Sequence, residues 1–377
     1  MAGIYIHVPF CKQACHYCDF HFSTSLKKKN KMLLALQKEL VLRKAELNDE
    51  SIETIYFGGG TPSILEPHEI EGLLDTVYAH YKVSDNPEVT LEANPDDLPK
   101  NQILRLSQTP INRLSIGIQS FFDIDLTLMN RAHNAKEAFV CLEEAMVFFD
   151  NISIDLIYGI PGMDEKRWER NMTRALSHGV PHISAYALTV EPRTALEHFI
   201  KEGKVPDVDD GQAQRQFHML VGCLEAKGYI NYEISNFGKP GFFSHNNTAY
   251  WKGKHYIGIG PSAHSFDGKR RGWNVRNNSK YIKALEENQV PIEHEVLSVR
   301  DRYNEYVMTG LRTIWGVSLQ KVRKEFGPTY EQYLGQQAAK YIAEHLLFWD
   351  GDVLLTTKKG KFLADGIASD LFMVNLS

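Results

Sequence analysis

The sequence has no hydrophobic run long enough to cross a bilayer, and it has no excess of basic residues. A membrane-spanning helix needs about 20 consecutive apolar residues, and no stretch of this chain approaches that length. Lys and Arg number 42 against 47 Asp and Glu, which gives a formal net charge of −5. This balance argues against a protein that binds nucleic acid or a membrane surface through bulk positive charge. The amino terminus also lacks a basic region followed by an apolar segment, so we expect no signal peptide.

Cysteine is scarce and unevenly placed. The 377 residues include five cysteines, and Cys11, Cys15 and Cys18 lie close together in the chain. An odd, clustered set does not form a disulfide framework, so it indicates a reducing compartment and a metal site. The other two, Cys141 and Cys223, lie in segments with helical patterns and are expected to be structural. We therefore expect a cytoplasmic protein.

The clustered cysteines have the spacing C-x3-C-x2-C. Thiolates are soft ligands that suit iron–sulfur clusters or zinc. No further cysteine completes the set, because position 20 is Phe20. Two nearby histidines, His16 and His21, keep a zinc-binding structural protein as an alternative. Three thiolates on a four-iron cluster would instead leave one iron open for a substrate.

Strands and helices alternate along the first two thirds of the chain. We expect strands near residues 2–7, 52–57, 89–92, 113–119, 152–158, 183–188 and 229–234. Helical patterns lie between them, near residues 26–47, 67–81, 102–107, 136–149, 165–177 and 212–227. This alternation predicts parallel strands with crossover helices, hence a barrel or a doubly wound sheet. Polar and glycine residues fall where these strands end, which favours an α/β barrel with a site at one mouth.

The composition changes after about residue 280. Helical patterns near 301–313, 319–326 and 330–345 precede a hairpin signal at 347–355, centred on Asp350 and Gly351. Helices followed by a hairpin resemble a winged helix, but the basic residues nearby are too few to indicate DNA binding in an acidic chain. We predict two domains, a barrel over residues 1–280 and a helical, winged-helix-like domain over 281–377.

A glycine run, Gly58-Gly59-Gly60-Thr61, directly follows one expected strand. It indicates either a tight turn with positive φ or a close approach of the backbone to a ligand. The run lacks the lysine of a P-loop and the spacing of a dinucleotide-binding turn. Taken alone it is weak evidence, and the cysteine triplet upstream makes the ligand-binding interpretation stronger.

Together these motifs resemble the radical S-adenosylmethionine (SAM) superfamily, in the branch that contains anaerobic coproporphyrinogen III oxidases and heme chaperones. The segments that carry the resemblance span nearly the whole chain: 5–11, 57–62, 92–95, 115–120, 155–159, 232–237 and 258–264. The resemblance implies a partial (β/α)6 barrel of the TIM type, followed by a smaller, mainly helical C-terminal domain that ends in a β-hairpin.

The resemblance also implies the cofactors. Cys11, Cys15 and Cys18 would ligate three irons of a [4Fe-4S] cluster, and SAM would chelate the fourth iron. An electron from the cluster could then cleave SAM to methionine and a 5′-deoxyadenosyl radical. The residues expected around SAM and the cluster are Tyr5, Tyr17, Gly59, Gly60, Thr61, Glu92, Gln119, Arg131 and Asp155.

Two functions occur in this branch, the oxidation of coproporphyrinogen III and the binding and delivery of heme. Only ten residues precede Cys11, and Phe20 replaces an additional cysteine of the oxidases. Both features favour the chaperone. The chaperones also carry H-N-x-x-Y-W, which resembles His245 to Trp251 here. His245 is one residue further from Tyr250-Trp251 than the pattern requires, and Asn246 occupies the histidine position. We predict His245 as a heme ligand.

The sequence therefore predicts a cytoplasmic radical SAM protein that carries heme as cargo. Its expected partners are heme or a porphyrin, a heme-accepting protein, and an electron donor such as a flavodoxin or ferredoxin, with no nucleic acid. The fold could in principle cleave SAM reductively, yet we do not expect a true coproporphyrinogen III oxidase. That oxidase, in porphyrin biosynthesis, and the zinc protein are the alternatives.

Overall fold

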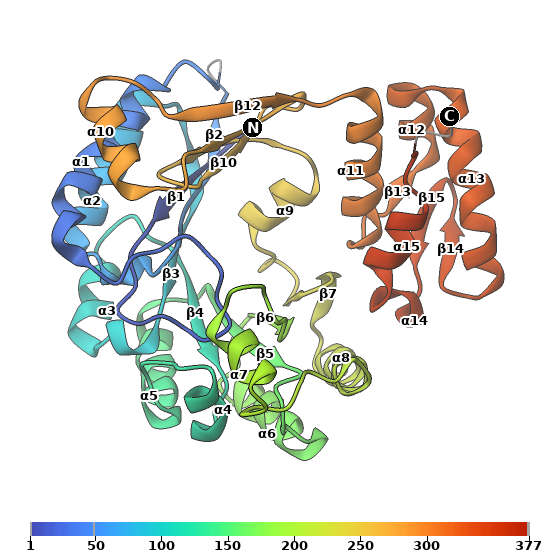
Figure 1. Cartoon of the computed structure of the whole chain (residues 1–377), viewed down its shortest axis with the longest axis horizontal. Coiled ribbons are helices and arrows are strands. Elements are labelled where there is room, and N and C mark those ends of the chain that lie inside the picture. Colours follow the sequence, from blue (N-terminus) through green and yellow to red (C-terminus); the bar gives the residue numbers. More distant parts are fainter. Residues whose placement is uncertain (1, 48–49, 375–377) are drawn as a thin grey trace.

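The structure is a computed structural model that describes residues 2–47 and 50–374, and its centre is a twelve-stranded sheet (Figure 1). The strand order is β12-β11-β10-β9-β1-β2-β3-β4-β5-β6-β8-β7. Strands β1 to β6 run parallel to one another. Their bounds are Ala2–Val8, Ile52–Gly59, Val83–Ala93, Arg113–Gln119, Ile152–Tyr158 and His182–Ala187.

Helices connect these parallel strands, as the alternation predicts. Parallel neighbours need a crossover connection, which a helix on the outer face supplies. The crossover helices are α1 (Lys29–Leu42), α2 (Pro67–His80), α3 (Lys100–Leu106), α5 (Ala135–Phe148) and α6 (Glu165–Ser177), and α8 (Asp210–Glu225) follows β6. Two expected helix starts carry their capping signals. Pro67 occupies the first turn of α2, and Asn134 and Glu137 form a capping box at α5.

The curved sheet does not close, and antiparallel strands form both of its ends. On one side β6 pairs with β8 (Asn236–Gly238), which pairs with β7 (Ile230–Glu233). On the other side β9 (His255–Ile259) runs parallel to β1. It leads into β10 (His264–Phe266), β11 (Arg270–Asn274) and β12 (Ile292–Val296). The predicted partial α/β barrel is confirmed.

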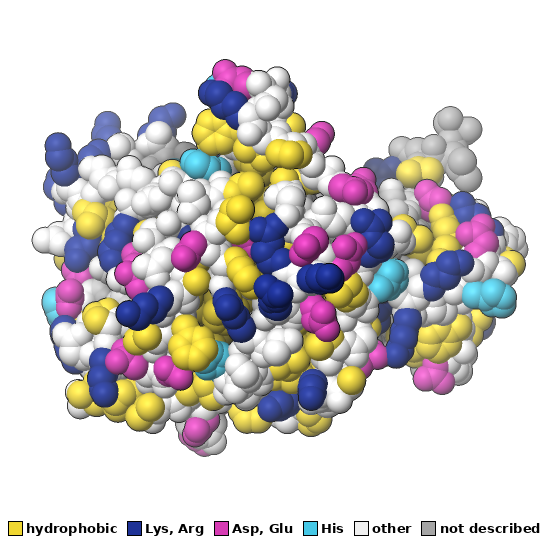
Figure 2. Space-filling model, turned by 90° about the horizontal axis from the view of Figure 1, so that it is seen from below, with side chains coloured by type: hydrophobic (Ala, Val, Ile, Leu, Met, Phe, Trp, Pro, Cys, Tyr) yellow, Lys and Arg dark blue, Asp and Glu magenta, His cyan; other side chains and the backbone are white. Residues whose placement is uncertain are grey.

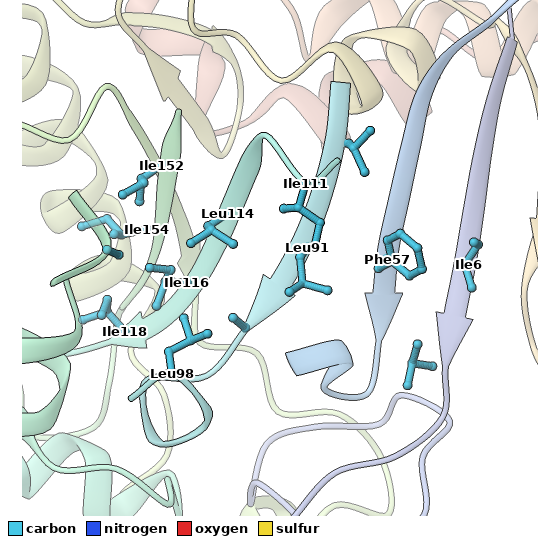
Figure 3. Close-up of a cluster of buried hydrophobic side chains, with 14 of the residues drawn as sticks. Ile6, Phe57, Leu91, Leu98, Ile111, Leu114, Ile116, Ile118, Ile152 and Ile154 are labelled. Atoms are coloured by element: carbon cyan, nitrogen blue, oxygen red, sulfur yellow. The ribbon is translucent and has the colours of Figure 1, made fainter. Parts of the chain in front are cut away.

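Alternation along the strands separates an apolar outer face from a polar inner face. Ile6, Phe57 and Leu91 lie side by side in the strand register, and all three are fully buried (Figure 3). Successive strand residues point to opposite faces. Their neighbours Tyr56 and Glu92 therefore point into the barrel, where their side chains are hydrogen-bonded to each other. The outer face packs against the helices, which leaves the inner face for polar residues.

A second, separate core lies in the C-terminal part of the chain. It is formed by α11 (Val299–Leu311), β13 (Val317–Ser318), α12 (Leu319–Phe326), α13 (Pro328–Ala343), β14 (Leu347–Asp350) and β15 (Val353–Thr356) with α15 (Ala364–Asp370). The hairpin forms as predicted, but it is not the last element. Thr357 caps a short helix, α14 (Lys358–Lys361), and α15 follows.

The division of the chain at residue 280 stays a prediction. Helix α10 (Asn278–Glu286) lies next to it, and its buried Tyr281, Ile282 and Leu285 belong to the barrel core. The first buried residue of the second core is Tyr303. Strand β12 and the start of α11 link the two cores (Figure 1).

The C-terminal part also contacts the open side of the barrel. Ile314 donates a backbone hydrogen bond to Tyr232 at 3.0 Å, and Lys361 donates to the carbonyl of Asn231 at 3.1 Å. Burial lowers the pKa of Lys361 to about 8. The face in Figure 2 carries Lys and Arg interspersed with Asp and Glu, without a region of a single sign. No helix within the described residues is long and apolar enough to span a membrane.

Candidate functional site: a cavity at the cysteine loop

A cavity of about 460 Å³ lies at the carboxyl ends of the parallel strands, beside the cysteine loop. Barrel proteins place their sites at this end because the strand-to-helix loops converge there. Eleven of the predicted residues line it: Cys11, Cys15, Tyr17, Cys18, Gly59, Gly60, Thr61, Glu92, Gln119, Arg131 and Asp155. Tyr5 and His245 do not line it.

The cysteine loop follows β1 and is tied to the barrel by backbone hydrogen bonds. The Cys11 N–H donates to Ser23 at 3.1 Å, and the His16 N–H donates to Met129 at 3.1 Å. All three thiols of the triplet are free and half-buried. Burial raises the pKa of Cys11 and of Cys18 to about 11. Without a metal these groups are therefore neutral thiols at pH 7.

The glycine run packs directly against the cysteine loop. The Gly60 N–H donates to Val8 at 2.9 Å, and the Thr61 N–H donates to Phe10 at 2.7 Å. A Cβ atom on Gly60 would lie 2.5 Å from the Phe10 carbonyl oxygen, so the close approach requires glycine. Gly59 has a φ of 108°, a conformation that other residues rarely adopt. Both interpretations of the run therefore hold, since it contains a positive φ and also lines the cavity.

Arg131 reaches the cavity from the loop after α4 (Asp123–Leu128). Its guanidinium donates to the Cys15 sulfur at 3.3 Å, to the Asn94 side chain at 2.5 Å and to the Gly117 carbonyl at 3.0 Å. Its Nε atom is buried and has no hydrogen-bond partner within the described part of the chain. A buried guanidinium with an unused donor is suited to bind a carboxylate.

Two carboxylates, Glu92 and Asp155, face the cavity from the inside of the barrel. Glu92 accepts from the Tyr56 hydroxyl at 2.7 Å and from the Gly59 N–H at 3.2 Å. Burial, with a smaller contribution from the charge of Asp155, raises the pKa of Glu92 to about 7. Burial raises the pKa of Asp155 to about 6 against a hydrogen bond from Ser184. Both groups can accept hydrogen bonds from hydroxyl or amino groups of a ligand.

The cavity fits an iron–sulfur cluster with SAM better than a single metal ion. Three thiols line one cavity together with two carboxylates and with Arg131, whose buried Nε has no partner among the residues that the structure describes. Yet within residues 2–47 and 50–374 no three His, Cys, Asp or Glu side chains are placed to hold one ion. A cluster spreads its cysteine ligands over several irons, whereas zinc gathers four ligands around one point. The zinc alternative gains no support.

Several residues of the cavity were not predicted. Asn94 binds Arg131 and also donates to the Thr61 hydroxyl at 3.2 Å, and Ser115 donates to Asp155 at 3.4 Å. Asn94 directly follows β3, and Ser115 is the third residue of β4. Both lie in the segments 92–95 and 115–120 that carry the family resemblance, which was the available signal. Tyr5 lies deeper in the barrel, with its ring stacked on Tyr56 at 6.0 Å between centroids.

The segment that resembles H-N-x-x-Y-W forms α9 (His245–Trp251) beside the open edge of the barrel. Glu88 accepts from the backbone N–H groups of His245 and Asn246 at 2.9 and 3.0 Å. The Asn246 side chain is buried and accepts from the Thr54 hydroxyl at 3.2 Å. His245 is exposed. The pattern's histidine position is thus a buried asparagine in this chain.

Comparison with known proteins agrees with the cavity. A model of the radical SAM superfamily matches residues 5–175, and a model of the HemN C-terminal domain matches residues 297–363. The heme chaperone HemW of Bacillus subtilis is 34% identical over 97% of this chain and 98% of its own length. The chain belongs to the HemW family of radical SAM proteins. A Mycobacterium tuberculosis HemW is also 34% identical, over 98% of this chain and 94% of its own length.

Among solved structures, the coproporphyrinogen III oxidase HemN of Escherichia coli superposes with a TM-score of 0.86. The superposition covers 99% of this chain and 90% of HemN, at 21% identity, so it establishes the shared fold. The radical SAM superfamily, to which HemW proteins belong, uses a [4Fe-4S] cluster and SAM.

Proposed function

We propose that Cys11, Cys15 and Cys18 hold a [4Fe-4S] cluster and that the adjoining cavity binds SAM. When bound, this pair supplies one-electron chemistry. The residues of the chain position it and exclude water. The observation that supports the proposal is that one cavity is lined by the three thiols, by Arg131 and by the half-buried carboxylates Glu92 and Asp155. The Nε of Arg131 has no hydrogen-bond partner among the described residues.

Each polar residue has a role that follows from its position. Arg131 would pair with the SAM carboxylate through its free Nε, and Asp155 would accept from the ribose hydroxyls. Glu92, Gln119, Gly59, Gly60 and Thr61 would form the remaining polar wall, with Tyr17 against the cluster. Tyr5 would act from behind this wall through Tyr56.

We further propose that the protein is a heme chaperone, which binds heme and delivers it to an acceptor protein. The support is full-length similarity to several proteins named heme chaperone HemW. An acceptor protein and an electron donor such as a flavodoxin or ferredoxin would be its partners. The assignment of His245 as a heme ligand stays a prediction.

The alternative function is oxygen-independent coproporphyrinogen III oxidation, which the likeness to HemN in fold keeps open. Against it stands Phe20, which lines the cavity with 68% of its surface exposed where the oxidases carry a cysteine. Turnover of coproporphyrinogen III to protoporphyrinogen IX with SAM and a reductant would establish the oxidase and refute the chaperone.

The cluster is tested by anaerobic reconstitution of the wild-type protein. We expect about four irons per chain and an absorption and EPR spectrum that SAM alters. Replacing Cys11, Cys15 or Cys18 by alanine should abolish the spectrum. The matched controls are Cys141→Ala and Cys223→Ala, which remove thiols outside the cavity. Binding of zinc alone, or equal loss in the control variants, would refute the assignment.

Heme binding is tested by titrating the protein and following the Soret band. Stable stoichiometric binding is the expected result, and its absence would refute the chaperone proposal. The same titration on His245→Ala measures whether this exposed histidine ligates the iron.

A further inference from the structure

A second and larger cavity, of about 970 Å³, lies between the barrel and the C-terminal part of the chain. One wall is formed by α9 and the strands β9 to β12, and the other by α11, α12 and the loop between them. None of its lining residues is shared with the cysteine cavity. Its volume is at the upper end of the range of small-molecule and cofactor sites, about 300–1,000 Å³. We call it the interdomain groove.

Aromatic side chains from both walls line the interdomain groove. The barrel side contributes Trp251 and Tyr256, and the C-terminal side contributes Tyr306 and Trp315. All four are partly exposed. Flat apolar surfaces on both walls are suited to stack against a planar ring.

Cationic side chains lie among these rings. The Lys252 ammonium is 4.3 Å from the ring centroid of Trp315, and the Lys321 ammonium is 4.3 Å from that of Tyr306. Arg302 has a buried Nε without a hydrogen-bond partner. Within the described part of the chain, none of these three has a carboxylate at ion-pair distance. The charges are therefore available to an anionic ligand.

The carboxylates of the groove are either paired or exposed. Glu305 forms an ion pair with Arg271, and Asp301 accepts from Ser298 at the start of α11. Glu295 and Glu325 are exposed. Among the described residues, five cationic and four anionic side chains line the groove, which leaves an excess of one positive charge.

We propose that the interdomain groove binds the macrocycle of a tetrapyrrole, stacked on the aromatic walls with its carboxylates at Lys252, Lys321 and Arg302. This inference rests on the proposed heme chaperone function and gives that cargo a location. A flat apolar ring that carries carboxylates matches both the rings and the unpaired cations. His245 does not line the groove, so binding in this proposal depends on the macrocycle and its carboxylates and not on ligation of iron by His245.

Titration of three ligands tests the proposal: heme, metal-free protoporphyrin IX, and protoporphyrin IX dimethyl ester, whose carboxylates are blocked. Wild-type protein should bind heme and metal-free protoporphyrin with dissociation constants within about threefold of each other, and the ester at least about tenfold more weakly. Trp315→Leu should weaken heme and protoporphyrin about tenfold or more, since aromatic anchors dominate such sites.

The double variant Lys252→Gln/Lys321→Gln should weaken both carboxylate-bearing ligands about tenfold and leave the ester unchanged. Lys239→Gln is the matched control, because Lys239 lies over the Tyr229 ring at 5.4 Å outside the groove. Its affinities should equal those of the wild type. Both lysines of the double variant are exposed, so this variant tests the site even if Trp315→Leu perturbs the fold.

Two results would separate the inference from the function on which it rests. If wild-type protein binds no heme, the proposed function fails and the inference with it. If wild-type protein binds heme, but both groove variants bind it equally well and His245→Ala loses it, the inference alone is overturned.

Discussion

Gly60 has no side chain, which allows its backbone to pack directly against the backbone of the cysteine loop. Its Cα lies so close to the backbone of the loop that a Cβ would meet the Phe10 carbonyl at 2.5 Å and the Val8 carbonyl at 2.9 Å. Backbone atoms in a buried loop cannot move aside as a flexible side chain can. The position of the thiols relative to the glycine run therefore depends on this residue.

We expect Gly60→Ala to lower the free energy of unfolding by about 1–3 kcal/mol, the usual cost of overpacking, and to reduce the iron content after reconstitution. Gly366→Ala is the control. It lies in α15 with nothing within 4 Å of the added Cβ, so it should stabilise the protein by up to about 1 kcal/mol. Thermal unfolding and iron analysis distinguish the two. Wild-type behaviour of Gly60→Ala would contradict the packing argument.

Glu92 gives a prediction for pH dependence. Its pKa rises from the ordinary 4.5 to about 7 in the folded protein because its carboxylate is buried. The folded state therefore binds this proton more tightly than the unfolded state, and the associated stability is present below about pH 4.5 and is lost as the pH rises to about 7. Above pH 7 the wild type bears the full cost of a buried charge.

Glu92→Gln removes this ionisation. Measured without SAM, the free energy of unfolding of the variant relative to the wild type should rise between pH 4.5 and 7, by at most about 3 kcal/mol. A constant offset from the altered hydrogen bonds to Tyr56 and Gly59 will add to it. Denaturant titrations at a series of pH values measure the difference. A difference that does not change with pH would show that Glu92 titrates normally.

At the scale of elements, α9 depends on a carboxylate from a distant strand. Glu88 in β3 accepts from the first backbone N–H groups of this seven-residue helix, and Arg113 lies 4.0 Å away. The first N–H groups of a helix have no partners within it, so a buried helix start needs such an acceptor. Glu88 thereby fixes Trp251 at the edge of the interdomain groove.

Glu88→Gln should cost about 1.5–3 kcal/mol, the usual value for hydrogen bonds to a charged group, because an amide nitrogen cannot accept. Hydrogen exchange in a peptide that covers residues 245–251 should become faster. Glu286→Gln, on an exposed ion pair with Lys31, should change stability by less than about 1 kcal/mol. Unchanged exchange in the Glu88 variant would mean that α9 is held by other contacts.

The sequence predicted the elements in which hydrophobic residues recur with a clear helical or strand period. The expected strands 113–119 and 152–158 and the helices 165–177 and 319–326 match the structure residue for residue. Helix 26–47 is shorter, since α1 ends at Leu42. The short helices α4, α7 (Ala195–Lys201) and α9 and the strands β9 to β12 were missed. These helices have fewer than two turns, and these strands are too short for an alternating hydrophobic pattern to be recognised. Tertiary contacts therefore determine their conformation.

The same limit applies to the candidate site. Residues at strand ends could be placed together because parallel strands bring their carboxyl ends to one edge. Arg131 was placed only through the family resemblance, and the Asn94 contact that orients it depends on how two loops pack. The interdomain groove could not be predicted, because its walls come from two cores that no sequence pattern relates.

At the scale of the whole molecule, the two cavities are lined by different strands, the interdomain groove by β9 to β12 and the cysteine cavity by β2 to β6. Tyr256 of the interdomain groove pairs with Gly3 at the start of β1, whereas Cys11 follows the end of β1. At about 3.3 Å per residue, the strand from Gly3 to Val8 places Tyr256 roughly 17 Å from the start of the cysteine loop. Tyr250 of the groove lies nearer, because its pKa is raised by burial and, to a smaller extent, by the charge of Glu92 in the cysteine cavity. Transfer of a hydrogen atom requires the reacting atoms to approach to about 3–3.5 Å.

A tetrapyrrole bound in the interdomain groove would therefore be released chemically unchanged, even if SAM is cleaved at the cysteine loop. Porphyrin extracted after incubation with SAM and a reductant should have the same mass as the porphyrin supplied, while methionine accumulates independently of it if SAM is cleaved. A porphyrin that has lost carboxyl groups or gained an adenosyl fragment would show that the cargo reaches the other cavity. Because different strands line the two cavities, one protein could hold a reactive cofactor and a porphyrin at the same time.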